Sequence, residues 1–280
     1  MYAKLLDDAV VAARAGGEVL RRFLGAADLE VRRKGENDFV TEADRASEAA
    51  VVGEIRRRYP HHHVLAEEGG TLAGGSGDYQ WLIDPLDGTT NFTQGLKIFC
   101  VSVACRRGSE LVAGVVYDPV GEELFTASQG GGAFRNGQPI RVSARPRLEG
   151  AFLATGYPFR AHAALDLYLA AFRDVFLSAR AVRRCGAAAL DLAYTAAGIY
   201  DGFFEFRLSP WDIAAGALLI EQAGGRITDL DGGAGYLAGG NVVAGAQGVH
   251  EELRAAIARH AGEADLARLV PAAEPAEVAS

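Results

Sequence analysis

The sequence predicts a mixed α/β fold, on three observations. Residues 4–24 carry apolar side chains at helical spacing along one face, which predicts an amphipathic helix. Residues 98–127 contain three short runs rich in β-branched and aromatic residues, separated by glycine or proline, which predicts an antiparallel sheet. From residue 150 onward, predicted strands alternate with predicted helices, as in an α/β layer.

Length and composition are typical of a globular enzyme. The chain has 280 residues, enough for a full hydrophobic core, and it is 49% hydrophobic and 23% charged. We expect a single domain over residues 1–265, with helices and an antiparallel sheet in residues 1–145 and an α/β layer in residues 150–265. Residues 266–280 are rich in Ala, Glu and Pro, so we expect a frayed or disordered tail there.

Charge, cysteine content and hydrophobicity argue against several classes of protein. The formal net charge of −8, with dispersed arginines, disfavours a nucleic-acid-binding face. Three cysteines without a C-x-x-C motif indicate a reducing compartment. The N-terminus lacks the apolar core of a signal peptide, and the longest uncharged apolar stretch, residues 213–220, is too short to span a bilayer. We therefore expect a cytoplasmic protein without nucleic-acid or membrane partners.

The first half begins with two predicted helices. After residues 4–24, the polar residues 29–41 predict a mobile loop or a hairpin. A second helix begins near residues 41–44 and ends before Pro60. Asp44 lies in its first turn, where the helix dipole favours a carboxylate, so its simplest interpretation is a charge that stabilises the start of the helix.

Shorter elements follow the second helix. The three histidines at residues 61–63 cannot all face one ion on an extended backbone, so we interpret them as a surface turn. Residues 64–66 predict a buried strand that ends in Glu67, and residues 71–78 predict a polar, glycine-rich loop. An Asn-Gly pair within residues 132–140 predicts a hairpin.

A linker at residues 143–150 precedes the alternating half of the chain. The strands expected in this half are residues 152–155, 181–183, 203–206 and 241–244, and the expected helices are residues 162–177, 187–198, 211–223 and 249–259.

Residues 81–92 carry the strongest functional signal. An apolar run delivers Asp84 and Asp87 on either side of Pro85, where we expect the strand to break because proline lacks a backbone donor. Gly88 lets the backbone approach a ligand closely, and residues 89–91 predict the first turn of a helix, whose N–H groups attract an anion. Paired carboxylates beside a phosphate cradle suit a Mg²⁺ ion that bridges protein and substrate phosphate. The alternative is a capped turn with two solvated aspartates.

Asp212 opens the helix predicted to continue through residues 213–223. This helix is apolar nearly all round, which predicts burial on every side. A buried carboxylate at its start needs the helix dipole, a metal ion or both. Together with Glu67, Asp84 and Asp87, it offers hard oxygen ligands that select Mg²⁺ or Mn²⁺ over zinc. Two such ions can clamp the oxygens of an in-line phosphoryl displacement.

Two long motifs resemble the signatures of the inositol monophosphatase family. They are residues 81–92 (WLIDPLDGTTNF) and residues 210–225 (PWDIAAGALLIEQAGG), and the resemblance extends over about residues 4–260. Residues 34–44 and 188–194 are most similar to the bacterial inositol-1-monophosphatase branch. The resemblance implies a sugar-phosphatase-type α-β-α-β-α sandwich, usually a homodimer. It also implies lithium-sensitive, Mg²⁺-dependent hydrolysis of a phosphate monoester by a metal-activated water.

The resemblance also implies roles for particular residues. Thr89 and Asp44 would orient and activate the attacking water, and Lys34 would lie in a mobile loop that closes over the site and brings in a third metal. The implied metal ligands are Glu67, Asp84 and the Leu86 carbonyl for the first ion, and Asp84, Asp87 and Asp212 for the second. The implied substrate contacts are Gly88 and Thr89 on the phosphate, and Asp87, Arg184, Gly186, Ala187, Ala188, Glu205 and Asp212 on the sugar-alcohol side.

One departure leaves the substrate open. The family often has Ser or Thr where this chain has Ala187, so a hydroxyl beside the substrate is missing. Phosphatases of 3′-phosphoadenosine 5′-phosphate, fructose 1,6-bisphosphate or histidinol phosphate share the metal core and differ in the substrate wall. Glu205, an acceptor for sugar hydroxyls, favours a polyol. A protein of another class, a binding or regulatory protein on the same fold, is the remaining alternative.

Overall fold

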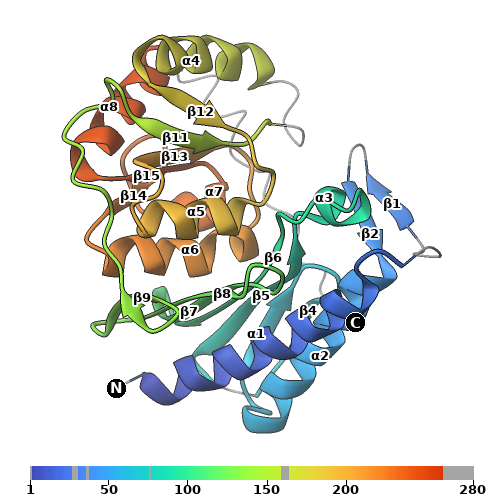
Figure 1. Ribbon diagram of the computed structural model, residues 1–280. Coiled ribbons are helices and arrows are strands. Elements are labelled where there is room, and N and C mark those ends of the chain that lie inside the picture. The colour runs from blue at the N-terminus through green and yellow to red at the C-terminus, as the bar shows by residue number, and fades with distance from the viewer. Residues whose placement is uncertain (1, 27–30, 36–37, 76, 159–163, 261–280) are drawn as a thin grey trace, which may run out of the picture.

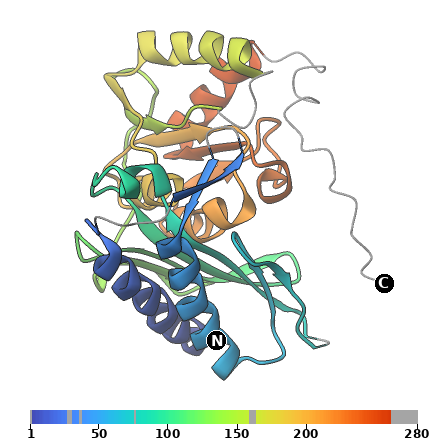
Figure 2. The same ribbon diagram turned by 90° about the vertical axis from the view of Figure 1, so that its right-hand side faces the viewer.

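The computed structural model describes residues 2–26, 31–35, 38–75, 77–158 and 164–260 of the chain. Five layers stack in the order helix, sheet, helix, sheet, helix (Figure 1), and the view turned by 90° shows the same order (Figure 2). The predicted α-β-α-β-α sandwich is therefore confirmed. The predicted tail at residues 266–280 lies outside the described residues.

The first layer consists of α1 (Ala3–Phe23) and α2 (Glu42–Arg58). Small residues on α1 let the helix approach the sheet closely: a Cβ on Gly17 would lie 2.6 Å from the ring of Tyr117. At the start of α2, Thr41 and Asp44 form a capping box, which satisfies backbone N–H groups at the helix end. Both helices agree with the sequence prediction.

The second layer is an eight-stranded sheet. Its spatial order is β10-β9-β8-β7-β6-β5-β3-β4, and every pair is antiparallel except β3 with β5. Strand β4 overlaps the start of the segment that we predicted as a loop, residues 71–78. The strands are β3 (His63–Ala66), β4 (Gly70–Leu72), β5 (Tyr79–Asp87), β6 (Cys100–Arg107), β7 (Glu110–Asp118), β8 (Glu123–Ser128), β9 (Gly132–Arg135) and β10 (Gln138–Pro139).

Strand β5 does not break at Pro85, so that prediction is wrong. Its register with β6 shifts between Asp84, which faces Ser102, and Asp87, which faces Cys100. Two residues of β5 therefore oppose one of β6, as in a β-bulge. Because a bulge leaves one residue out of the hydrogen-bond ladder, a proline there removes no strand pairing.

The remaining layers contain a five-stranded sheet between two pairs of helices. The sheet order is β12-β11-β13-β15-β14, with β11 parallel to both its neighbours. Helices α5 and α6 lie between the two sheets, and α4 and α8 cover the outer face (Figure 1). We did not predict β14 and α7. The elements are β11 (Phe152–Thr155), α4 (Leu165–Ser178), β12 (Ala181–Arg183), α5 (Ala188–Ala196), β13 (Gly202–Glu205), α6 (Pro210–Gln222), β14 (Arg226–Thr228), α7 (Tyr236–Gly239), β15 (Val242–Gly245) and α8 (Gln247–Ala258).

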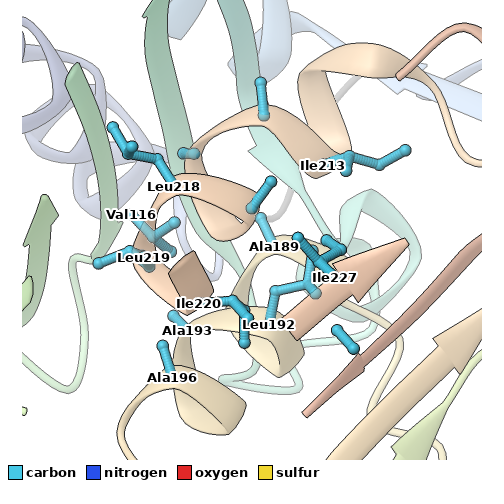
Figure 3. Close-up of a cluster of buried hydrophobic side chains, with 14 of the residues drawn as sticks. Val116, Ala189, Leu192, Ala193, Ala196, Ile213, Leu218, Leu219, Ile220 and Ile227 are labelled. Atoms are coloured by element: carbon cyan, nitrogen blue, oxygen red, sulfur yellow. The ribbon is translucent and has the colours of Figure 1, made fainter. Parts of the chain in front are cut away.

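Helix α6 forms the centre of the molecule. Its residues from Asp212 to Ile220 are all buried, as predicted for a helix that is apolar all round. Figure 3 shows Leu218, Leu219 and Ile220 of this helix packed together with Leu192 of α5 and other apolar side chains. This packing fixes the position of the first turn of α6, which carries Asp212.

A two-stranded hairpin and a short helix lie at one edge of the large sheet. The hairpin consists of β1 (Val31–Gly35) and β2 (Asp38–Thr41), which pair antiparallel, so of the two predicted forms the chain adopts the hairpin. Helix α3 (Thr89–Thr93) contacts β2. Within the described residues, we find no helical segment whose length and hydrophobicity would allow it to span a bilayer.

The histidines at residues 61–63 are more than a surface turn. The ring of His62 stacks on Tyr59 and Tyr79 at centroid distances of 4.7 and 4.8 Å. Its Nδ1 accepts a hydrogen bond from Trp81 Nε1 at 3.1 Å. His62 is therefore part of the packing beside β5, a role that a turn prediction from sequence does not include.

Candidate active site

Four carboxylates, here called the acidic corner, come together from three elements: Glu67, Asp84, Asp87 and Asp212. Asp84 and Asp87 flank the bulge of β5, and both are buried. Glu67 follows β3, and its backbone N–H donates to the Ile83 carbonyl at 3.1 Å. Asp212 lies in the first turn of α6, where its carboxylate accepts the Ser209 N–H at 2.8 Å. Strand pairing and helix packing thus bring together carboxylates that lie far apart in the sequence.

Burial and mutual repulsion raise the pKa values of Asp84 and Asp87. Burial raises the pKa of Asp84 well above its usual value, and the negative charges of Glu67, Asp87 and Asp212 raise it further. The pKa of Asp87 rises to about 7, mainly by burial and by Asp212, although the Ala189 N–H donates to it at 2.7 Å and opposes the rise.

The donor set of the acidic corner fits a hard divalent cation. In the part of the chain that the structure describes, no three His, Cys, Asp or Glu side chains could hold a metal ion as they stand. Repulsion among buried carboxylates is nevertheless the situation that a cation relieves, and oxygen-only donors suit Mg²⁺ or Mn²⁺. The predicted ligand Leu86 lies in the same turn: its N–H donates to Asp84 Oδ1 at 2.9 Å.

Thr89 and Asp44 form a hydrogen-bonded pair next to the acidic corner. The hydroxyl of Thr89 lies 3.0 Å from Asp44 Oδ1 and 3.1 Å from the Leu86 carbonyl oxygen, and it can donate to either. Asp44 is fully buried and also accepts the backbone N–H of Thr41 at 2.8 Å. Burial raises the pKa of Asp44, while the hydrogen bonds from Thr41 and Thr89 oppose the rise. Asp44 therefore has a partner at the site as well as a role at the helix start.

Gly88 forms the turn between β5 and α3. Its φ of 95° lies in the left-handed region, and a Cβ at this position would lie 2.9 Å from the Ile98 carbonyl oxygen. Only glycine avoids both the backbone strain and the clash. Gly88 is the N-cap of α3, so the first N–H groups of this helix, which have no acceptors within the helix, follow Asp87 directly in the chain.

A second group of residues, here called the substrate wall, borders the acidic corner: Gly156, residues 184–188 and Glu205. Glu205 ends β13 and is 6% exposed. Burial raises its pKa well above the usual value, Asp191 and Asp212 add to the rise, and Arg184 opposes it. A Cβ on Gly156 would lie 1.9 Å from the Glu205 carboxylate, so this carboxylate fills the space beside the glycine.

Arg184 and Tyr157 form the exposed rim of the substrate wall. The guanidinium of Arg184 lies 5.2 Å from the centre of the Tyr157 ring. Its Nη1 would lie 2.6 Å from a Cβ on Gly186, whose φ is 86°. Ala187 precedes α5 as its N-cap, with no side-chain capping bond, and Ala188 begins the helix. The structure thus places Arg184 near both Gly186 and Glu205, and Ala187 and Ala188 follow in the same segment.

Several site residues were missed in the sequence. Gly156 and Tyr157 follow strand β11 directly, and the rule that singled out Glu67, a strand that delivers residues to a glycine loop, would have found them. Asp191 is a buried carboxyl within the apolar helix α5, and burial raises its pKa. Lys34 lies in β1, but its side chain is outside the described residues, so its proposed role stays a prediction.

The two stacked sheets, with helices between and outside them, and the buried carboxylates Asp84, Asp87 and Asp212 define a layered α/β protein with an acidic site. The family pattern described as "Inositol monophosphatase family" matches residues 1–263, and the chain belongs to this family.

Individual relatives agree with this assignment. The chain is 50% identical over 246 residues to "Nus factor SuhB" of Pseudomonas aeruginosa, a match that covers 86% of this chain and 91% of that protein. It resembles the crystal structure of extragenic suppressor protein suhB from Bartonella henselae with a TM-score of 0.88 and 41% identity, covering 91% of this chain and 98% of that one. It resembles inositol monophosphatase from Anabaena with a TM-score of 0.82 and 40% identity, covering 92% and 96%.

Proposed function

We propose that this protein hydrolyses phosphate monoesters of polyols in the presence of Mg²⁺, with inositol 1-phosphate as its substrate. The observation that carries the proposal is the Thr89–Asp44 pair beside the acidic corner, with a hydroxyl-to-carboxylate distance of 3.0 Å. A buried carboxylate that accepts the threonine proton leaves the threonine oxygen free to accept a proton from a water molecule.

The acidic corner would hold two or three Mg²⁺ ions, or Mn²⁺, through Glu67, Asp84, the Leu86 carbonyl, Asp87 and Asp212. When bound, these ions supply the positive charge that stabilises a phosphate and activates water. The acidic corner repels an anionic substrate in their absence, which is why we infer that turnover depends on them.

The protein's own groups would do the remaining work. Thr89 Oγ1 passes its proton toward Asp44 and aligns the attacking water on the phosphorus. The N–H groups of Gly88 and Thr89 bind phosphate oxygens. On the leaving-group side, the Glu205 carboxylate accepts hydrogen bonds from polyol hydroxyls, while Arg184 donates at the rim. Lys34 would approach with its hairpin when substrate is bound.

The substrate wall supports a polyol over the other candidates. Glu205 is a buried acceptor for hydroxyls; inositol 1-phosphate offers more free hydroxyls than 3′-phosphoadenosine 5′-phosphate, fructose 1,6-bisphosphate or histidinol phosphate. The Tyr157–Arg184 rim is nevertheless an aromatic and basic contact of the kind a nucleotide would use. These three compounds therefore remain as alternative substrates.

A second candidate is a binding or regulatory protein on this fold. Relatives named Nus factor SuhB favour it, and this name gives no support to our expectation that nucleic acid is not a partner. That expectation, the cytoplasmic location, the homodimer and the sensitivity to lithium stay predictions. Catalysis and binding are compatible in one molecule.

Phosphate release from a panel of substrates tests the proposal. The panel contains inositol 1-phosphate, the three alternative substrates and p-nitrophenyl phosphate, each with Mg²⁺, with Mn²⁺ and with EDTA. We expect metal-dependent turnover that is fastest on inositol 1-phosphate. Faster turnover of another compound in the panel would identify that compound as the substrate in place of inositol 1-phosphate. No turnover with either ion would refute the proposed enzymatic activity and favour a binding protein.

A further inference from the structure

The side chain of Asn91 connects the two halves of the site. Helix α3, which carries it, lies at the edge of the molecule between the two sheets (Figures 1 and 2). The amide Nδ2 donates to the Ile98 carbonyl at 2.8 Å and to the Cys185 carbonyl at 2.9 Å. Ile98 lies next to the turn at Gly88 and Thr89, here called the phosphate-binding turn because we propose that it binds the phosphate. Cys185 belongs to the substrate wall. One amide group thus bridges two segments that the fold brings together from distant parts of the sequence.

The orientation of this amide follows from its partners. Carbonyl oxygens only accept hydrogen bonds, so the Asn91 side chain must present its two N–H groups to them. Asn91 is 8% exposed, and loss of either bond would leave a carbonyl oxygen without its donor in a region shielded from water. Among uncharged side chains only those of asparagine and glutamine provide two donors on one atom, and glutamine is one methylene longer.

The two acceptors are themselves in contact with the site. A Cβ built on Gly88 would lie 2.9 Å from the Ile98 carbonyl oxygen, so this oxygen packs against the phosphate-binding turn. On the other side, a Cβ on Gly186 would lie 3.4 Å from Asn91 Nδ2 and 2.6 Å from Arg184 Nη1. Gly186 is therefore enclosed between the asparagine amide and the guanidinium of Arg184.

We propose that Asn91 is a positioning residue that fixes the loop of residues 184–187 against the phosphate-binding turn, and thereby sets the distance between the substrate wall and the acidic corner. Its effect on substrate choice rests on the proposed function, whereas its effect on the loop does not. Without these bonds the loop moves away from the phosphate-binding turn, and the substrate wall is no longer held at a fixed distance from the bound phosphate.

A thiol assay tests the loop directly, without any substrate. Cys185 is partly exposed in the loop, whereas Cys100 and Cys105 are buried. We expect Asn91→Ser to raise the reaction rate of Cys185 with an aromatic disulfide reagent about tenfold, because two hydrogen bonds are lost. Cys100 and Cys105 should stay protected, and the Cys185→Ser variant identifies the reacting thiol. Thr93→Ala, which removes a hydroxyl bond to the Thr90 carbonyl in the same helix, is the matched control and should react as the wild type does.

Kinetics test the consequence for recognition. The ratio of kcat/KM for inositol 1-phosphate to that for p-nitrophenyl phosphate should fall about fivefold in Asn91→Ser, mainly through KM, because only the polyol uses the wall. Gly186→Ala places a Cβ between Arg184 and Asn91 and should therefore displace the same loop. We expect it to raise the reaction rate of Cys185 and to lower the ratio of kcat/KM values, as Asn91→Ser does.

Three results would overturn the proposal. An unchanged rate for Cys185 would show that the loop does not depend on Asn91, and an unchanged ratio despite a faster thiol would show that the loop does not set recognition. Simultaneous reaction of all three thiols would show that Asn91 stabilises the fold as a whole. A wild-type protein without turnover on any substrate would refute the proposed function alone, since the thiol assay is independent of it.

Discussion

The acidic corner and the substrate wall are neighbours that differ in how they manage buried charge. The acidic corner gathers four carboxylates, of which Asp84 and Asp87 have raised pKa values because burial and like charges oppose ionisation. The wall buries the Glu205 carboxylate with Arg184 as its nearby opposing charge. We therefore expect the acidic corner to need a bound cation, whereas the wall has Arg184, which opposes part of the rise in the pKa of Glu205.

The difference implies different responses to substitution. A change in the acidic corner removes a charge that the metal-free fold is better without, so function falls while stability holds or rises. A change in the wall alters the shape of a surface that contacts the leaving group, so substrate preference changes while the chemistry remains. The predictions below separate these two kinds of effect, from the largest to the smallest.

Asp87→Asn should lower kcat/KM by at least about 10³-fold, because a predicted metal ligand and its charge are lost. Its melting temperature in EDTA should equal or exceed that of the wild type, since the amide oxygen still accepts the Ala189 N–H and a buried charge has gone. Phosphate release and thermal unfolding in EDTA measure the two effects. Turnover at the wild-type rate would show that Asp87 has no role in catalysis.

The pH dependence of stability isolates the acidic corner. The pKa of Asp87 is about 7 in the folded protein against an ordinary 3.8, so between these pH values the folded state binds more protons than the unfolded state. In EDTA, stability from this group is present below pH ~4 and is lost as pH rises through about 7.

We expect Asp87→Asn to match the wild type near pH 4 and to exceed its free energy of unfolding by about 2–4 kcal/mol near pH 8, in EDTA. Urea unfolding across this range measures the difference. With saturating Mg²⁺ the wild type should regain the advantage, because only it binds the ion well. A difference that shrinks as pH rises would contradict the raised pKa.

Gly156→Ala should change the wall and spare the acidic corner. The added Cβ would overlap the Glu205 carboxylate, with atoms only 1.9 Å apart, and displace it from its position. We expect kcat/KM for inositol 1-phosphate to fall about 10–100-fold, and that for p-nitrophenyl phosphate to change about twofold or less. Gly53→Ala, at an open position of α2, is the matched control. Equal losses on both substrates would show that Glu205 does not recognise the polyol.

Ala187→Ser should have the smallest effect. Ala187 is the N-cap of α5 and makes no side-chain capping bond; since the Ala189 N–H already donates to Asp87, a serine hydroxyl would accept the next N–H of the first turn. We expect stability to rise by about 0.5–1 kcal/mol, with kcat/KM for the polyol changed by about threefold or less. Urea unfolding and steady-state kinetics measure both. A loss of stability would show that the site has no room for the hydroxyl.

Sequence patterns predicted the regular elements best where periodicity was long. The helices around α1, α2 and α6 and most strands lie where apolar spacing placed them. Strand β4 and helix α7 were missed because three or four residues carry too little periodicity to predict an element. The expected break at Pro85 was wrong because proline chemistry excludes ladder bonds and does not exclude a bulge.

The sequence by itself determined the acidic corner in outline. Its carboxylates each follow or open an apolar element, and the motif at residues 81–92 holds two of them within four residues. Local spacing is enough to bring Asp84 and Asp87 together, since a strand and a turn have fixed dimensions, whereas Glu67 and Asp212 join them through strand pairing and helix packing.

Only the tertiary structure decided the substrate wall. Gly156, Arg184 and Glu205 meet because β11 pairs with β13 and because Asn91 bonds the loop after β12. Contacts of this kind depend on how the layers pack. A local sequence pattern does not predict which distant side chains will be in contact. The Glu205 carboxylate occupies the space that a Cβ on residue 156 would need. This contact depends on how the side chains of the whole core pack, so it cannot be predicted from either segment alone.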